Sequence, residues 1–215
     1  MNDQPAVALE CGTPASRELR MYAEVPEDAA GGSYPIEVTV RTRDGATVSA
    51  TATIELSVEH RLFDFESGTQ GWTAGTNVSG VARVGSFANG PGKPFEGSGA
   101  LEATVPGVDA SAPKTVRVDQ ALDLSDAGEL HAHLDCYGGA PGATGYEATI
   151  TVSAGDDRRT ATQPISCDSW NTLTVALAGW AGRASVSRIE VGFRALGTTA
   201  VWSPRFQVDD IGVTG

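Results

Sequence analysis

The sequence lacks the positive charge and the long apolar runs that several classes of protein require. It has 15 Lys and Arg residues against 27 Asp and Glu residues, and a formal net charge of −12. An acidic surface repels nucleic acids and anionic membranes, because both are negatively charged. No run of about 18 apolar residues is present, so no membrane-spanning helix is predicted. Neither nucleic acid nor membrane is therefore an expected partner.

Motifs of the common catalytic sites are also missing. The sequence has no Gly-x-Ser-x-Gly elbow, no phosphate-binding loop and no His-Glu-x-x-His helix. Asp156 and Asp157 are adjacent carboxylates, but they fall in a predicted turn and are most simply a solvated hairpin. The chain is therefore predicted not to be an enzyme.

Cysteine is scarce, and the three cysteines leave two interpretations open. Cys11, Cys136 and Cys167 form no Cys-x-x-Cys pair, so they predict no zinc site. They are either three buried thiols, or a Cys136–Cys167 disulfide with Cys11 left single. Cys136 ends a predicted strand and Cys167 lies just before another, so these two could be adjacent. A disulfide would suit a secreted protein.

What the sequence does contain favours strands and turns. Glycine is abundant, with 26 residues, and Leu/Glu/Lys-rich helical windows are missing. In the first part, strands are expected at residues 6–10, 18–25, 34–42 and 46–58, the last two joined by an Asp44-Gly45 hairpin turn. In the second part, alternating and turn-bounded segments predict strands at residues 61–66, 78–84, 99–105, 114–122, 129–137, 146–154, 159–166, 170–177, 186–195 and 206–213.

A first resemblance covers the N-terminal quarter. Val25-Pro26, the turn at residues 30–34 and the following hairpin are similar to the C-terminal part of a bacterial Ig-like accessory domain of secreted glycosidases. Residues 1–59 are therefore expected to form an Ig-like β domain. Such a domain normally has about 80–100 residues, so its first strands are expected to be missing.

A second resemblance covers residues 60–215. The segments FDFESGTQGW, SGALEA, ALDLSDAGEL, SWNTLTVAL and FQVDDIGV occur in this order. The order resembles jelly-roll carbohydrate-binding modules of the galactose-binding-like superfamily. It implies an all-β, antiparallel jelly-roll sandwich that binds a glycan without cleaving it. It also implies a place beside a catalytic domain of the same polypeptide, in a secreted bacterial glycoside hydrolase.

A calcium site is expected where the first and last strands of the second domain meet. Phe63 and Phe65 share one face, so Asp64 and Glu66 share the other, and Asp209 faces away from the core on the last strand. Hard oxygen ligands at one sheet edge suit Ca²⁺, and members of the resembled family often carry calcium there. The alternative is that these acids are solvated or accept hydrogen bonds from loop amides.

A sugar-binding face is expected on the strand at residues 129–137. Its apolar residues alternate with polar and aromatic ones, which predicts that His131, His133, Asp135 and Tyr137 share the outer face. Arg194 follows the same logic on its own strand. Aromatic rings stack on sugars, and polar groups bond their hydroxyls. The alternative is an ordinary solvated face. The two histidines could also bind a transition metal, but the sequence offers no evident third ligand.

The tryptophans divide into two pairs. Trp72 and Trp170 are expected in the core, whereas Trp180 and Trp202 lie in predicted loops and are the better ligand candidates. The alternative for the second pair is that they cover an edge of the sandwich. The Gly- and Pro-rich stretch at residues 87–97 predicts a long loop, and such loops are often functional.

Three classes of function follow from these observations. A carbohydrate-binding module predicts exposed aromatic residues on one sheet face or on loops at one end of the sandwich. A purely structural accessory domain predicts that Trp180 and Trp202 are buried. A β-sandwich lyase or hydrolase would need clustered acids with a His or Tyr in a groove. The binding module is the favoured interpretation, and the structural domain is the main alternative.

Overall fold

The computed structural model describes residues 32–41, 44–56, 59–88 and 91–215. The chain divides into two units, Met1–Ala30 and Gly31–Gly215, and the first lies outside the described residues. The strands expected at residues 6–10 and 18–25, and Cys11, fall there as well. Within the described part, no helix is long and apolar enough to cross a membrane.

The strands β1 (Gly32–Arg41) and β2 (Thr47–Leu56) form the expected antiparallel hairpin. Gly45 in its turn has a φ of +93°, a conformation that glycine adopts without steric cost. The hairpin forms a two-stranded sheet of its own. The Ig-like character of this region, and the domain boundary between residues 59 and 60, stay predictions.

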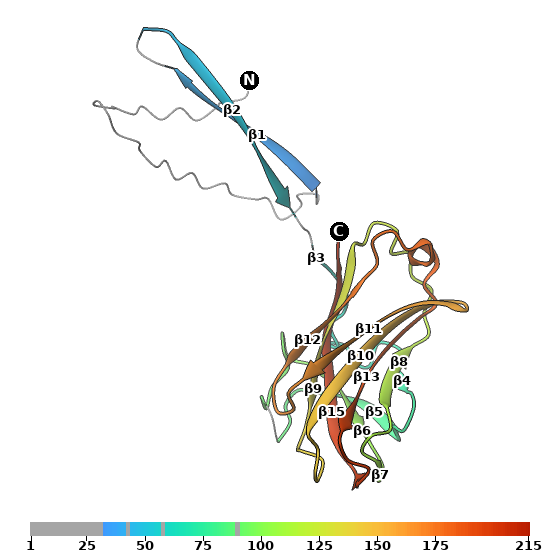
Figure 1. Cartoon of the computed structure of the whole chain (residues 1–215). Coiled ribbons are helices and arrows are strands. Elements are labelled where there is room, and N and C mark those ends of the chain that lie inside the picture. Colours follow the sequence, from blue (N-terminus) through green and yellow to red (C-terminus); the bar gives the residue numbers. More distant parts are fainter. Residues whose placement is uncertain (1–31, 42–43, 57–58, 89–90) are drawn as a thin grey trace. The chain divides into compact units, whose positions relative to one another are not determined.

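The rest of the chain is a sandwich of two antiparallel sheets, which confirms the predicted all-β class (Figure 1). One sheet has the order β11 (Asp157–Ile165), β10 (Gly145–Ala154), β13 (Arg188–Leu196), β8 (Lys114–Val118) and β4 (Thr73–Ala74). The other has the order β12 (Asn171–Ala176), β9 (Glu129–Cys136), β15 (Arg205–Thr214), β6 (Ala100–Thr104) and β5 (Gly80–Val84), with β3 (Glu59–Phe63) also paired to β15.

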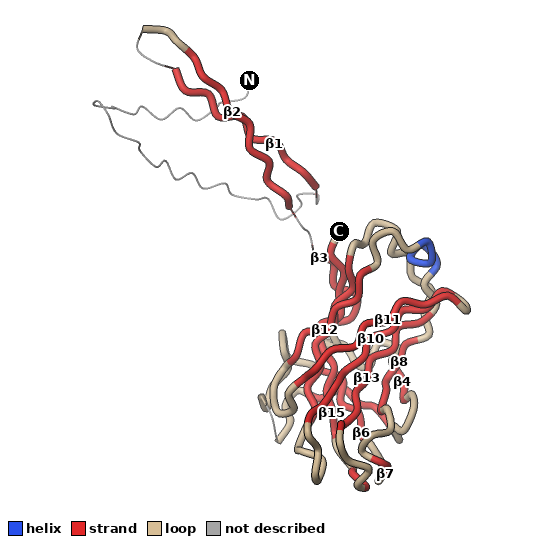
Figure 2. The backbone as a smooth tube through the Cα atoms, in the orientation of Figure 1, coloured by secondary structure: helices blue, strands red, loops and turns tan. Residues whose placement is uncertain are grey.

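Three further short elements belong to the described part of the sandwich. The short strands β7 (Val108–Asp109) and β14 (Val201–Trp202) pair with each other. A single helical turn, η1 (Ala181–Ser185), lies at one end of the sandwich, and strands make up most of the remainder (Figure 2). All ten strands expected in this part of the chain are present, and the first and last of them are neighbours, as predicted.

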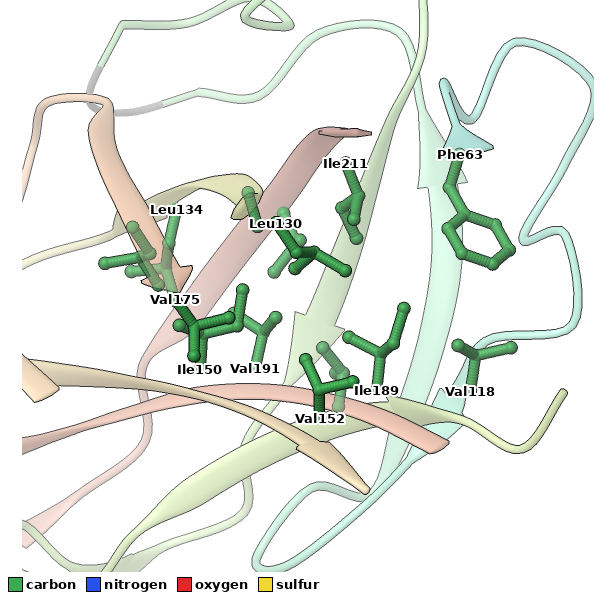
Figure 3. Packing of buried hydrophobic residues seen from close by; sticks show 14 of the residues in the cluster. Phe63, Val118, Leu130, Leu134, Ile150, Val152, Val175, Ile189, Val191 and Ile211 are labelled. Carbon is green, nitrogen blue, oxygen red and sulfur yellow. The ribbon is translucent and has the colours of Figure 1, made fainter. Parts of the chain in front are cut away.

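The core lies between the two sheets and follows the alternation of the sequence. Leu130 and Leu134 of one sheet point toward Ile150 and Val191 of the other (Figure 3). Trp72 is 1% exposed and packs edge-on against the rings of Phe63 and Phe65, in the core position predicted for it. This filled interior leaves the outer faces and the loops for function.

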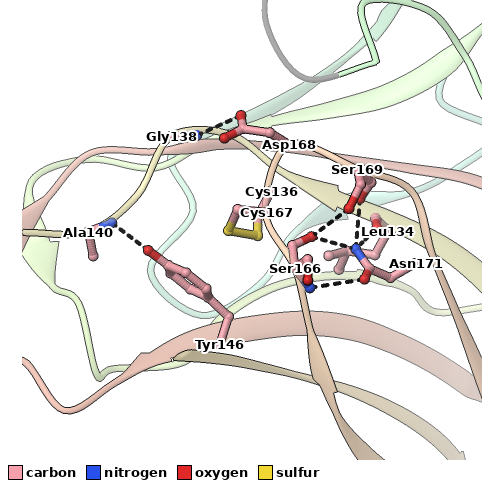
Figure 4. Close-up of a disulfide and its surroundings, with 10 residues drawn as sticks. All are labelled: Leu134, Cys136, Gly138, Ala140, Tyr146, Ser166, Cys167, Asp168, Ser169 and Asn171. Carbon is pink, nitrogen blue, oxygen red and sulfur yellow. Dashed lines mark hydrogen bonds between the residues drawn. A yellow bond between two sulfur atoms is a disulfide. The ribbon is translucent and has the colours of Figure 1, made fainter. Parts of the chain in front are cut away.

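A disulfide joins Cys136 and Cys167, which is one of the two interpretations that the sequence left open (Figure 4). It links the end of β9 to the turn before β12. Asn171 reinforces this turn, because its side-chain amide donates hydrogen bonds to the carbonyls of Leu134, Ser166 and Ser169. The backbone at this end of β9 is therefore held by covalent and polar links together.

Candidate functional site

A groove with a volume of about 710 Å³ lies on the outer face of the six-stranded sheet. Its floor comes from β3, β9, β12 and β15, and the loop at residues 91–99 contributes one side. The groove is lined by Glu59, Arg61, Phe95, Glu96, Glu129, His131, His133, Thr172, Thr174 and Asp210.

The floor contains both histidines of the predicted polar face. Leu130, Ala132 and Leu134 of β9 point into the core, so His131 and His133 point outward, as the alternation predicts. Both residues are only 7% exposed, because neighbouring side chains surround them. Burial lowers the pKa of His133 to about 4, and the nearby Asp210 carboxylate only partly opposes this. His133 is therefore neutral near pH 7.

Two irregularities in strand pairing bring further residues into the groove. In β15 the register against β9 shifts between Asp209 and Gly212, and Asp210 has a φ of +44°. In β3 the register against β15 shifts, so that Phe63 lies opposite Ile211 but Arg61 lies opposite Gly212. A bulge of this kind redirects side chains to the other face of a sheet. Asp210 and Arg61 meet in the groove for this reason.

Arg61 is the cation of this groove. Its guanidinium forms ion pairs with Glu96 and with Asp210, the latter at 2.5 Å between Nε and Oδ1. The hydrogen bond to Glu96 raises the pKa of Arg61 above its ordinary value and lowers the pKa of Glu96. Glu59, Glu96, Glu129 and Asp210 together outnumber this single cation, so the lining has an excess of acidic groups.

Aromatic rings form one wall of the groove. Phe95 is 44% exposed and stacks on His133, with ring centroids 3.5 Å apart and planes 10° apart. Trp170 meets the rings of Phe95 and Phe87 edge-on, and its indole N–H donates to the carbonyl of Lys93. The prediction that Trp170 belongs to the core is wrong, because the ring is half-buried at the rim of the groove. The long loop at residues 87–97 supplies Phe87 and Phe95.

The three carboxylates expected to hold calcium instead anchor this loop and its neighbours. Asp209 accepts hydrogen bonds from the amides of Phe95 and Glu96. Glu66 accepts from the amides of Ser98 and Gly99. Asp64 accepts from the Gln70 side chain at 2.7 Å.

These carboxylates do not form a ready ligand set. In the described part of the chain, one group of three His and Asp side chains has its potential metal-ligand atoms within 4.8 Å of one another, and this group consists of other residues. Asp64, Glu66 and Asp209 are not among those residues. Calcium stays a prediction, which melting curves with and without a chelator would test.

The remaining two residues of the predicted face lie beyond the lining of the groove. Tyr137 follows β9 and is exposed, and its role in binding stays a prediction. Asp135 is fully buried, so its carboxylate is not presented to a ligand, contrary to expectation. Burial, and to a smaller extent the neighbouring Asp168, raises the pKa of Asp135 to about 7.

Asp135→Asn is expected to stabilise the fold at high pH. An unfolded Asp titrates near 3.8, so the folded state binds more protons than the unfolded state between about pH 4 and pH 7. The stability of the native protein therefore falls as the pH rises through this window. Asn removes the buried charge, and we expect a gain of about 1–3 kcal/mol at pH 8 that fades by pH 4.

Urea unfolding at both pH values would measure this difference. Asp156→Asn is the matched control, because Asp156 is exposed in a turn and its replacement should change little at either pH. An equal gain at pH 4 and pH 8 would contradict the assignment to the Asp135 carboxylate.

Three other predicted ligand residues lie away from the groove. Trp180 is buried, because its ring packs into the core cluster and its indole N–H donates to Asp157 at 2.7 Å. Arg194 lies on the other sheet and pairs with Glu147. The prediction of exposed ligand contacts at Trp180 is therefore wrong, and Arg194 cannot share a face with His131.

Trp202 is also more enclosed than predicted. Its ring is half-buried and lies against Tyr146 and Phe193, and the ammonium group of the buried Lys114 is 5.5 Å from the ring centroid. Lys114 is held there by hydrogen bonds to backbone carbonyls. Trp202 thus packs partly against the sandwich, and its role in ligand binding stays a prediction.

Some of the lining residues had a signal in the sequence. Thr172 and Thr174 alternate with the core residues Leu173 and Val175, so the same pattern argument places them on the outer face. Phe95 lies in the long loop predicted at residues 87–97. Arg61 and Asp210 were not predicted, because bulges interrupt the alternation beside them. Glu59 was not predicted, because no strand was expected at this residue.

Fold and groove together define a β-sandwich of the carbohydrate-binding-module type. Residues 63–203 match the family model described as mannanase, galactose-binding domain-like, and this match covers more than half of the chain. The chain therefore belongs to that family. No curated protein matches it.

Two solved structures share the fold. One is described in work on the promiscuous specificity of carbohydrate-binding modules of the β-sandwich superfamily; it is 23% identical, with 85% of this chain and 74% of that chain covered and a TM-score of 0.54. The other is an exo-β-agarase, 14% identical, with 72% of this chain and 24% of that chain covered and a TM-score of 0.52. This chain thus spans about a quarter of the agarase.

Proposed function

We propose that the sandwich binds a neutral glycan in the groove, without cleaving it, as an accessory region of a secreted bacterial glycoside hydrolase or related glycan-processing enzyme. The observation that carries this proposal is an exposed ring, Phe95, beside a floor of hydroxyl, carboxylate and guanidinium groups. A ring stacks on the apolar face of a sugar, while Thr174, Glu129 and Arg61 can bond its hydroxyls.

The charge of the groove supports a neutral ligand. Four acidic groups against one cation disfavour a uronate, because like charges repel when they are brought together in a partly desolvated site. Membership of the mannanase-related family makes mannan the first polymer to test. The disulfide suits an oxidising, extracellular setting. Attachment to a catalytic domain would keep that domain close to its polymer.

Phe95→Ala is expected to weaken mannan binding at least about tenfold, which corresponds to about 1.4 kcal/mol. The loss follows because the variant removes the stacking surface and leaves the polar floor in place. Affinity electrophoresis in gels containing mannan, mixed-linkage glucan, xylan or polygalacturonate would measure it, followed by calorimetry with the best oligosaccharide.

Arg194→Ala is the matched control, since Arg194 is exposed on the other sheet and its loss should leave the affinity unchanged. Retention of full affinity by Phe95→Ala would place the glycan elsewhere. Failure of the native chain to bind any glycan would favour a purely structural accessory domain, which the burial of Trp180 also supports. Release of reducing ends from the polymer would contradict the non-catalytic part of the proposal.

A further inference from the structure

Three side chains on the floor of the groove are arranged like the ligands of a metal ion. His131 and His133 each offer a ring nitrogen and Asp210 a carboxylate oxygen, and these atoms all lie within 4.8 Å of one another. His133 Nε2 is 3.8 Å from Asp210 Oδ2. Ligand atoms of a tetrahedral zinc site are about 3.3 Å apart, given metal–ligand bonds of about 2.0–2.1 Å. A small contraction would therefore bring the three donors onto one ion.

The surroundings hold the two imidazole rings in place. Thr172 Oγ1 is 3.1 Å from His133 Nδ1, which lets Nδ1 carry the proton and leaves Nε2 to face Asp210. A hydrogen bond to the second ring nitrogen is the usual support of a metal-bound histidine. Phe95 stacks on the flat face of His133 and leaves the in-plane direction of Nε2 open.

Gly212 provides the room for the other ring. A Cβ at this position would lie 2.8 Å from both Cε1 and Nε2 of His131, so the ring could not stay in its present place beside it. His131 therefore lies directly over the backbone of β15, beside the bulge that presents Asp210. The bulge supplies the third ligand that the sequence pattern could not show.

The charges of the groove favour a divalent cation at this point. Arg61 occupies only Oδ1 of Asp210, at 2.5 Å, so Oδ2 is left for the ion. Glu59 Oε1 lies 3.1 Å from His131 Nε2 and can serve as a fourth ligand or as a nearby countercharge. His131, His133 and Asp210 are all more than nine-tenths buried, so the surrounding residues restrict the movement of these side chains.

We propose that His131, His133 and Asp210 form a binding site for a divalent transition-metal ion of the Zn²⁺ type, with Glu59 beside it. Imidazole ligands suit zinc, copper and nickel, whereas calcium prefers an all-oxygen shell. The site is distinct from the calcium site expected at Asp64, Glu66 and Asp209. It also does not depend on glycan binding, although an ion here would lie on the floor of the same groove.

Calorimetric titration of the tag-free chain with ZnCl₂ alone tests the proposal, with CaCl₂ as a parallel titration. We expect saturable binding of one Zn²⁺ per chain and none of Ca²⁺ at this site. His133→Gln and Asp210→Asn should each weaken Zn²⁺ binding more than about 100-fold, since even the loss of an outer-shell partner costs 10–100-fold. His60→Gln is the matched control, because His60 is the one other histidine of the chain and is exposed.

Two results would overturn the site. One is the absence of saturable zinc binding to the native chain. The other is unchanged affinity in folded His133→Gln and Asp210→Asn variants. Should a variant not fold, the histidine ring signals in the NMR spectrum of the native chain provide the test. Zinc-dependent shifts of the His131 and His133 signals support the site, and shifts confined to His60 exclude it. No glycan is present in these measurements, so their outcome is independent of the proposed function.

Discussion

Replacement of both Cys136 and Cys167 by Ala is expected to lower the free energy of unfolding by about 3–4 kcal/mol. The bridge closes a segment with a sequence separation of 31 residues, and without it the unfolded chain gains the corresponding conformational freedom. Reduction of the native protein should produce a similar loss. Guanidinium unfolding of the native, reduced and double-variant proteins would measure the three stabilities.

Thiol titration under denaturing conditions provides the control for this prediction. The native chain should show two fewer reactive thiols before reduction than after it. The expected contribution of the disulfide to stability would be contradicted if the double variant and the native protein, with its bridge intact, unfolded at the same denaturant concentration.

Trp72→Ala is expected to destabilise the sandwich by about 3–5 kcal/mol. The ring is enclosed by Phe63 and Phe65, and its removal leaves a cavity that these neighbours cannot fill. Trp170→Ala is the matched control, because the Trp170 ring is only half-buried at the rim of the groove and should cost less. Thermal and denaturant unfolding would compare the two variants, and equal losses would contradict the assignment of Trp72 to the core.

The strands could be predicted from the sequence because most of them have one face in the core. In β9 and β12, apolar residues alternate with polar ones over the whole length of the strand, so His131, His133 and Thr174 could each be assigned a face. Such an argument holds as long as the pairing register is regular, since side chains of a strand alternate with a period of two.

The rest of the groove could not be predicted in this way, because it depends on bulges and on loop packing. Arg61 has the same parity as the buried Phe63, and only the register shift in β3 turns it outward. Asp210 likewise enters the groove through the bulge in β15. Trp180 precedes a helical turn, and its burial is a consequence of tertiary packing that its neighbours in sequence do not reveal.

The position of β15 has a consequence for how the protein is made. This strand is the last along the chain, yet it pairs with β9 on one side and with β6 and β3 on the other. Until β15 has been synthesised, nothing links β9 to β6 and β3, and Asp210 and Gly212 are missing from the groove. Pairing across such sequence distances is slow, because loop closure costs entropy before the contacts form. The groove is therefore completed only after β15 has paired with β9 and β3, and the edges of these strands stay exposed until then.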